Sequence, residues 1–275
     1  MTTHRRCLFR MFTGAVALNA AAGAQENDGG HWADFLNWLK SAPPFEDPGV
    51  LLGAYRAHLL EHGVAAEEAA GRIARIMERM RGRPDGWRQI FNNIYAGAGS
   101  GFSARPNALL VSAVENRKPG KALDAGMGQG RNALFLAARG WEVTGFDLSE
   151  GGVAAARKSA AAAGLDINGI VAGSAEFDYG SSRWDLVVIT YVPFPVWEPA
   201  YASRLHAALR PRGLLVIESF ASEEGTAGRT PVDIDPARLL RAMLPLRILR
   251  FEDTEDIADW TLRKTRLVRL IAQKP

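Results

Sequence analysis

The sequence predicts an α/β fold, a doubly wound and mostly parallel sheet preceded by an N-terminal helical cap. Three observations lead to this prediction. A chain of 275 residues with 47% apolar content can bury a substantial core. Past Pro106, short runs rich in Val, Ile and Leu alternate with helical stretches, a pattern typical of βαβ units. A glycine-rich turn follows the first of these runs, where such sheets bind ligands.

The first 24 residues have the three parts of a secretory signal peptide. MTTHRRCLFR is basic, MFTGAVALNAAA is short and apolar, and Ala22-Gly23-Ala24 offers a small-residue cleavage site. The pair Arg5-Arg6 ahead of Leu8-Phe9 loosely resembles a twin-arginine signal. We therefore expect a periplasmic or secreted protein. The alternative is a cytoplasmic protein whose alanine-rich start is a chance run.

Charge and cysteine content exclude several classes of function. Residues 1–24 hold three arginines and no carboxylate, so the remainder carries 30 basic and 30 acidic side chains. A neutral body does not indicate a nucleic-acid partner. The only cysteine is Cys7, which excludes a disulfide framework and a zinc site built from thiolates. The chain has no run of about 18 apolar residues, so we expect no integral membrane span.

The N-terminal half of the chain predicts helices without strands. We interpret residues 25–30 as a linker and 31–95 as a helical cap. Apolar residues recur at helical spacing in 31–40, 50–61 and 65–81. Prolines and glycines punctuate these segments, and the glycine-rich AGAGSG follows them.

The sheet is expected within a ligand-binding domain that spans residues 96–275. Strands are predicted at 121–124, 142–147, 167–171, 185–191 and 214–220. Helices are predicted between them at 132–139, 150–163 and 195–209. Two final strands, 246–252 and 266–272, lie close together in the sequence and could pair antiparallel.

The turn LDAGMGQGRN has the spacing Gly-x-Gly-x-Gly at Gly126, Gly128 and Gly130. Glycines there allow a sharp turn and a close approach of backbone to ligand. The dinucleotide fingerprint has its third glycine one residue later, where this chain has Arg131. Asp124 precedes the turn, and its charge suits the ammonium of an amino-acid moiety better than a pyrophosphate.

A second acid, Asp147, ends the second predicted strand 23 residues after Asp124. An acid at this place can accept hydrogen bonds from both hydroxyls of a ribose. The ligand therefore has a ribose, an amino-acid end and no phosphate, and S-adenosylmethionine fits. A nicotinamide-dependent oxidoreductase is disfavoured by the glycine spacing.

The stretch ALDAGMGQGRNALFLAARGWEVTGFDLS resembles the first two motifs of the class I S-adenosylmethionine-dependent methyltransferases. Within them it is similar to a bacterial small-molecule group that includes tellurite-resistance and thiopurine-type enzymes, over about residues 90–275. The resemblance implies a seven-stranded, Rossmann-like sheet with a reversed last strand. It also implies that the three glycines surround the methionine part, that Asp147 binds the ribose, and that Phe146 and Leu148 pack on adenine.

Two departures from the family pattern concern the ligand. The family commonly has an acid after the third strand for the adenine amino group, and here Ser174 or Glu176 could serve. After the fourth strand the chain reads Thr190-Tyr191-Val192-Pro193. This differs from the Asn-Pro-Pro-Tyr motif used on amides and nucleobase amines, and argues against those substrates.

Methyl transfer from a sulfonium depends mainly on alignment, so a thiol or chalcogenide acceptor needs little or no base. Aromatic faces would stabilise the sulfonium by cation–π attraction, and the candidates are Tyr191, Tyr95 and Phe102. The alternative for each is ordinary core packing. Arg131 could contact a carboxylate or an anionic substrate, or be a solvated arginine at a helix start.

A competing pattern is His58-Leu59-Leu60-Glu61-His62, which matches the H-x-x-E-H of one metalloprotease group. It lacks a clear third ligand, so we interpret it as an exposed polar face and expect no metal site. His206, in a predicted helix, is interpreted as structural.

Our first hypothesis is a small-molecule methyltransferase whose helical cap covers the site and sets the choice of substrate. Four aromatic residues, Trp87, Phe91, Tyr95 and Phe102, suggest a partly apolar and enclosed pocket. The second hypothesis is a non-catalytic binding or sensor protein that keeps the fold, because export would separate the protein from cytoplasmic S-adenosylmethionine. The sequence leaves the methyl acceptor and the oligomeric state open.

Overall fold

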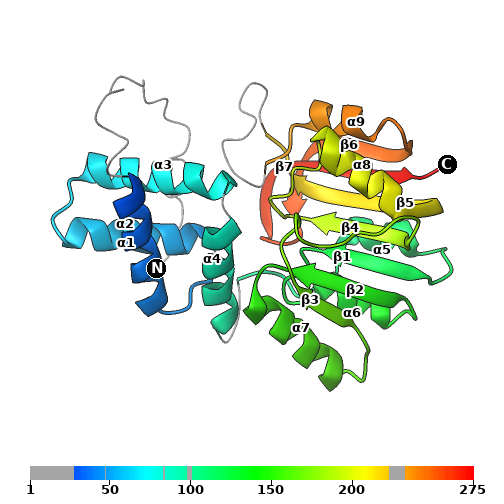
Figure 1. Cartoon of the computed structure of the whole chain (residues 1–275), viewed down its shortest axis with the longest axis horizontal. Coiled ribbons are helices and arrows are strands. Elements are labelled where there is room, and N and C mark those ends of the chain that lie inside the picture. Colours follow the sequence, from blue (N-terminus) through cyan, green and yellow to red (C-terminus); the bar gives the residue numbers. More distant parts are fainter. Residues whose placement is uncertain (1–27, 47, 83, 98–100, 223–232) are drawn as a thin grey trace. The chain divides into compact units, whose positions relative to one another are not determined.

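The computed structural model describes residues 28–46, 48–82, 84–97, 101–222 and 233–275 (Figure 1). The predicted signal peptide, residues 1–24, lies outside this part of the chain. The first helix begins at Asp28, within the stretch that we interpreted as a linker. The chain divides into two compact units, Met1–Ser100 and Gly101–Pro275, close to the predicted domain boundary at 95/96.

The first unit is helical. Its described helices are α1 (Asp28–Ser41), α2 (Pro48–Glu61), α3 (Ala66–Gly82) and α4 (Pro84–Ala96). Each contributes apolar side chains to a common core, in which Phe35, Leu51, Ile90 and Ile94 have no exposed surface. The Asn93 side chain fixes the loop after α1, since it accepts from the Phe45 amide and donates to the Ala42 and Pro43 carbonyls.

The second unit contains one sheet of seven strands in the order β3-β2-β1-β4-β5-β7-β6. The strands are β1 (Lys121–Ala125), β2 (Glu142–Asp147), β3 (Asn168–Val171), β4 (Trp184–Thr190), β5 (Leu209–Phe220), β6 (Arg247–Ala258) and β7 (Arg263–Gln273). β1 to β5 pair in parallel, and β7 pairs antiparallel with both β5 and β6. The predicted fold class, including the reversed last strand, is confirmed.

Alternate residues of the strands supply two separate cores, one on each face of the sheet. The described helices that cover these faces are α5 (Ala108–Val114), α6 (Arg131–Ala137), α7 (Glu150–Ala162), α8 (Pro199–Ala208) and α9 (Pro236–Met243). Leu186 and Val188 pack with α5 and α6, whereas Val187 and Ile189 pack with α8 and α9. Helices lie on both sides of the sheet, as a doubly wound fold requires (Figure 1).

The observed elements differ from the predicted ones mainly in short or polar segments. Helices α5 and α9 were not predicted, because their 7 and 8 residues are too few to produce a clear periodic pattern. Strand β6 continues about six residues past its predicted end, and strand β7 begins three residues before its predicted start. Their extension is charged, and cross-strand pairs such as Arg266–Asp253 and Lys264–Glu255 hold it together.

Candidate functional site

The glycine turn lies at the carboxyl end of β1 and leads into α6. Gly126, Gly128 and Gly130 all have positive φ, at 76°, 52° and 85°. A Cβ on Gly126 would lie 2.3 Å from a methyl carbon of Val192, and one on Gly130 would lie 2.8 Å from Ala156 Cβ. The turn therefore needs glycine for its backbone conformation and for close packing.

Asp124 is the buried acid beside this turn. The residue is 1% exposed, and its carboxyl group interacts with the Ala133 backbone and the Asn132 side chain. Its Oδ2 has no hydrogen-bond partner among the described residues. Burial raises the pKa of Asp124 to about 7, and nearby Arg131 opposes that rise. A buried acceptor without a partner is costly, so this oxygen suits a positively charged donor such as an amino-acid ammonium.

Asp147 is held by backbone amides at the end of β2. Its Oδ2 accepts from Gly128 N at 2.9 Å and its Oδ1 from Ser149 N at 2.8 Å, and the Leu148 amide is a third donor. Burial raises the pKa of Asp147, and these amides oppose the rise. Three of about four acceptor positions are thus occupied. One ribose hydroxyl can bind directly, whereas contact with both requires a backbone donor to give way.

The residues proposed for adenine differ in their surroundings. Leu148 is half-buried beside Asp147 and keeps an accessible apolar surface. Phe146 is fully buried and stacks on Phe177 at 4.3 Å, so the expectation that it packs on adenine is wrong. It belongs to the core because its side chain points to the face of the sheet that α8 and α9 cover.

The two polar candidates after β3 also have partners in the protein. Glu176 is exposed, and its Oε2 accepts from Gly173 N at 3.1 Å. The Ser174 hydroxyl bonds to Tyr201, and its carbonyl accepts from Arg204. Both stay predictions for the adenine contact.

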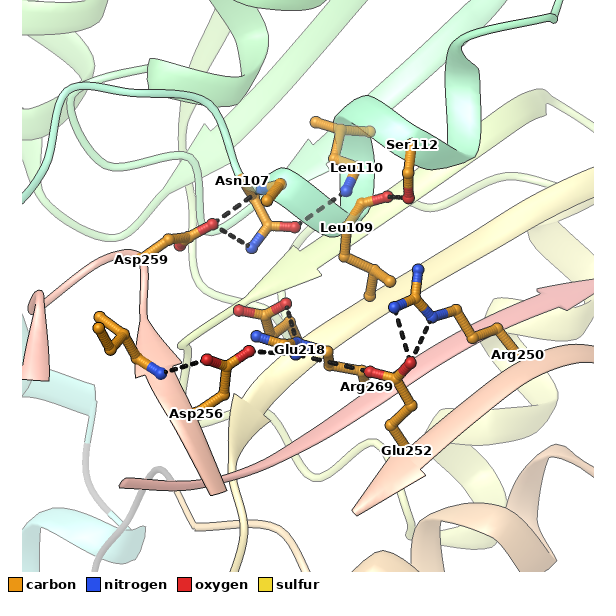
Figure 2. Close-up of polar contacts among 12 residues, drawn as sticks. Asn107, Leu109, Leu110, Ser112, Glu218, Arg250, Glu252, Asp256, Asp259 and Arg269 are labelled. Carbon is orange, nitrogen blue, oxygen red and sulfur yellow. Dashed lines mark hydrogen bonds and ion pairs between the residues drawn. The ribbon is translucent and has the colours of Figure 1, made fainter. Parts of the chain in front are cut away.

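Tyr191 follows β4 directly and has a φ of 55°, which is unusual for a bulky residue. The side chain is buried; its hydroxyl donates to the Glu218 carboxylate, and its amide donates to the Glu218 carbonyl at 2.9 Å. Burial and the Glu218 charge raise the pKa of Tyr191 far above its usual range. The neighbouring charge of Glu218 is balanced by Arg269, with 3.0 Å between Oε2 and Nε (Figure 2).

Arg131 is the first residue of α6, and its side chain is only 7% exposed. Its guanidinium contacts Asp259 Oδ1 through two nitrogen atoms, each at 3.0 Å, and lies over the Tyr191 ring. The alternative of a solvated arginine is therefore wrong. Phe102, also buried, stacks on Trp260 at 4.1 Å between ring centroids.

Three residues at this end of the sheet were missed by sequence analysis, namely Glu218, Asp259 and Trp260. Glu218 lies within an apolar strand, and the other two lie in the turn between β6 and β7. They are far from the glycine turn in sequence and belong to no recognisable motif, so no local pattern could have found them.

In the helical unit, Tyr95 lies on α4 in a ladder of rings with Phe91 and Trp87. The His62 ring bonds the His58 carbonyl at 2.8 Å, within one turn of α2. In the described ranges, no group of three or more His, Cys, Asp or Glu side chains could hold a metal ion. None of the helices that the structure describes is long and apolar enough to cross a membrane.

Comparison with known proteins supports the same interpretation. Residues 122–213 match the family described as methyltransferase domain. A ribosomal RNA small subunit methyltransferase C from Alcanivorax borkumensis is 41% identical over 91 residues. That match covers 32% of this chain and 27% of the relative, so the chain matches about a quarter of that protein's length.

Two solved structures show the fold. One was described for the conversion of a disulfide bond into a thioacetal group during echinomycin biosynthesis. It has a TM-score of 0.53 and is 23% identical, and the match covers 68% of this chain and 92% of that one. TehB from Haemophilus influenzae has a TM-score of 0.54 and 19% identity, covering 68% and 67%.

The sheet order, the glycine turn and the two acids define a class I, Rossmann-like methyltransferase unit. Residues 122–213 therefore belong to a methyltransferase domain, and S-adenosylmethionine is its cofactor. The residues present fit this cofactor, because the Asp124 oxygen without a partner can accept its ammonium.

Proposed function

We propose that the protein transfers a methyl group to a small-molecule nucleophile such as a thiol or chalcogenide, as in the tellurite-resistance and thiopurine-type group. One observation carries the proposal. Near the glycine turn, the ionisable side chains that follow β4 and begin α6 already have partners: Tyr191 donates to Glu218, and Arg131 pairs with Asp259. An acceptor that must lose a proton lacks an evident base among these side chains, and the proposal assigns the partnerless Asp124 oxygen to the cofactor ammonium. A thiolate or selenide needs no base.

On this proposal the cofactor supplies a methyl group on a positively charged sulfur. Asp124 accepts from the ammonium, the glycine turn admits the methionine part, and Asp147 accepts from the ribose. Leu148 contacts adenine, and Ser174 or Glu176 contacts the adenine amino group. These side chains hold the reactants in line, and such positioning accounts for about 7–11 kcal/mol of barrier lowering in favourable cases.

Aromatic residues complete the proposed acceptor side. Tyr191 and Phe102 lie in the sheet unit and are proposed for this role, and Tyr95, on α4 of the helical unit, stays a prediction. Aromatic faces attract a sulfonium by about 0.5–2 kcal/mol each. The left-handed backbone of Tyr191 supports a functional role, because such strain in a bulky residue persists where the surrounding structure enforces it.

An RNA acceptor is less well supported, although the relative from Alcanivorax borkumensis bears an RNA methyltransferase name. Residues 25–275 have equal numbers of basic and acidic side chains, and RNA binding relies on a basic surface. The second candidate function is a non-catalytic S-adenosylmethionine-binding or sensor protein that keeps the same site.

Calorimetric titration of the full chain tests the cofactor site. We expect S-adenosylmethionine and S-adenosylhomocysteine to bind and NAD not to bind. Asp147→Ala should abolish binding, and Asp147→Asn should weaken it roughly tenfold because a charge-assisted hydrogen bond is lost. Asp166→Ala is the matched control, since Asp166 is an exposed acid away from the turn. Equal affinity in all variants would contradict the site.

Turnover separates the enzyme from the sensor. Formation of S-adenosylhomocysteine is measured with a panel of thiols, selenides and tellurides, with hydroxyl compounds and RNA for comparison. Turnover of the soft nucleophiles, with a raised KM for the acceptor in Tyr95→Ala and unchanged cofactor affinity, supports both the acceptor class and the role of the cap. Tight cofactor binding without turnover of any acceptor would favour the sensor.

A further inference from the structure

The turn between β6 and β7, residues 259–262, makes polar contacts with segments that are far from it in the sequence. Its Asp259 carboxylate binds Arg131 at the start of α6 and Asn107 at the start of α5. Its Trp260 carbonyl accepts from Ser103 N at 3.0 Å. The turn therefore joins the segment before α5 to the helix that follows the glycine turn.

All acceptor capacity of Asp259 is used in these contacts. Oδ1 accepts both Arg131 nitrogens at 3.0 Å, and Oδ2 accepts from Asn107 Nδ2 at 2.9 Å and from Ala108 N at 2.8 Å. Figure 2 shows Asp259 facing Asn107 across this junction. A carboxylate that accepts from four donors, two of them on one arginine, has one strongly preferred orientation.

The partners of Asp259 continue the connection to the site. Asn107 N donates to Asn132 Oδ1 at 2.9 Å, and Asn132 Nδ2 donates to Thr190 Oγ1 at 3.1 Å, where β4 ends. Asn132 and Arg131 both interact with Asp124. The chain of contacts thus runs from the hairpin turn to the acid beside the glycine turn.

Trp260 places the same hairpin turn against the proposed acceptor residues. Its ring stacks on Phe102 and, at 5.6 Å between centroids, on Tyr191. Because Arg131 also lies over the Tyr191 ring, the positions of Tyr191 and Arg131 both depend on this turn.

We propose that Asp259 is a positioning residue of the methyl-transfer site: by holding Arg131 and Asn107 it fixes the start of α6, behind the glycine turn, against the segment that leads into α5. The proposal rests on the proposed function, since it assumes that the glycine turn binds the cofactor. Asp259 itself touches neither cofactor nor acceptor. Its removal leaves the Arg131 charge buried and unpaired, which a protein relieves by moving the side chain.

The test compares Asp259→Asn with Asp253→Asn in the full chain. Asp253 lies on the same hairpin and forms a two-point pair with Arg266 at 2.7 and 2.6 Å, away from the glycine turn. The affinity for S-adenosylhomocysteine is measured by calorimetry from pH 6 to 9, together with the melting temperature. The groups that face Asp124 are Arg131 and Asn132 of α6 and Asp147 of β2.

We expect Asp259→Asn to weaken binding roughly tenfold at pH 8, equivalent to one charge-assisted hydrogen bond. The pH below which binding is lost should also rise, because a displaced Arg131 no longer favours the ionised Asp124. Asp253→Asn should change neither quantity. If Asp259→Asn lowers the melting temperature but leaves the affinity and its pH dependence unchanged, Asp259 is merely structural and the proposal is overturned.

If Asp259→Asn fails to fold, Arg131→Gln tests the same ion pair from the other side. Weaker binding and a higher pH limit for binding are again expected, and a lower melting temperature without either change overturns the proposal. Absence of binding by the unmodified protein would overturn the proposed function and this proposal together. Binding by the unmodified protein with equal affinity in both hairpin variants would overturn the positioning role alone.

Discussion

At the scale of single residues, Asp124 has a cost to stability, and we propose that cofactor binding offsets this cost. Its pKa of about 7 in the folded protein lies above the ordinary value of 3.8. At a pH below 3.8, the protonated Asp124 contributes its full stabilisation to the folded protein. This contribution is lost as the pH rises through about 7. At pH 8 the folded protein therefore holds an ionised carboxylate in a buried site, where it is available to a cationic ligand.

We predict that the difference in free energy of unfolding between Asp124→Asn and the unmodified protein shifts in favour of the variant as the pH is raised from 5 to 8. The shift should be about 2–3 kcal/mol, since each unit of pKa shift corresponds to about 1.4 kcal/mol. Urea unfolding at the two pH values measures this difference. Cofactor binding should weaken in the same variant. An equal effect of the substitution at both pH values would contradict the raised pKa. Asp166→Asn, at an exposed site, is the control.

At the scale of elements, the junction of the glycine turn, α6 and α7 depends on Gly130. This residue is the N-cap of α6, and an added Cβ would lie 2.8 Å from Ala156 on α7. Gly130→Ala therefore combines an unfavourable φ with a steric clash. We expect a loss of about 2–4 kcal/mol in the free energy of unfolding and weaker cofactor binding, because α6 must shift.

Gly164→Ala provides the matched control for this substitution. Gly164 also has a positive φ, of 65°, but an added Cβ meets nothing within 4 Å. Its cost should be limited to the backbone term of about 1–2 kcal/mol, with cofactor binding unchanged. Calorimetry and denaturant unfolding of both variants measure the difference. Equal losses would show that packing between α6 and α7 does not matter.

At the scale of the whole molecule, the N-terminal pattern predicts export, which we propose as the route to a periplasmic or secreted location. Mass spectrometry of the protein from a bacterial host in which it is expressed tests this directly. We expect a mature chain that begins at Gln25, after Ala22-Gly23-Ala24. Retention of residues 1–24 would favour the cytoplasmic alternative and remove the main reason for considering a non-catalytic sensor.

The sequence by itself determined the fold class and the cofactor. Both depend on local patterns: alternating apolar strands and helices predict the sheet, and the glycine spacing with Asp124 and Asp147 predicts the cofactor. Adjacent residues carry those signals, because a turn and a strand end are formed by consecutive parts of the chain. The same locality explains why the short helices α5 and α9 were missed.

Only the tertiary structure decided which groups surround the opposite end of the site. Arg131 meets Asp259 across 128 residues of sequence, and Tyr191 meets Glu218 through the register of β4 and β5. Nothing in either neighbourhood of the sequence specifies the pairing, since it depends on the order in which strands are placed in the sheet. The physical reason is that a buried charge must find its partner in space, wherever that partner lies along the chain.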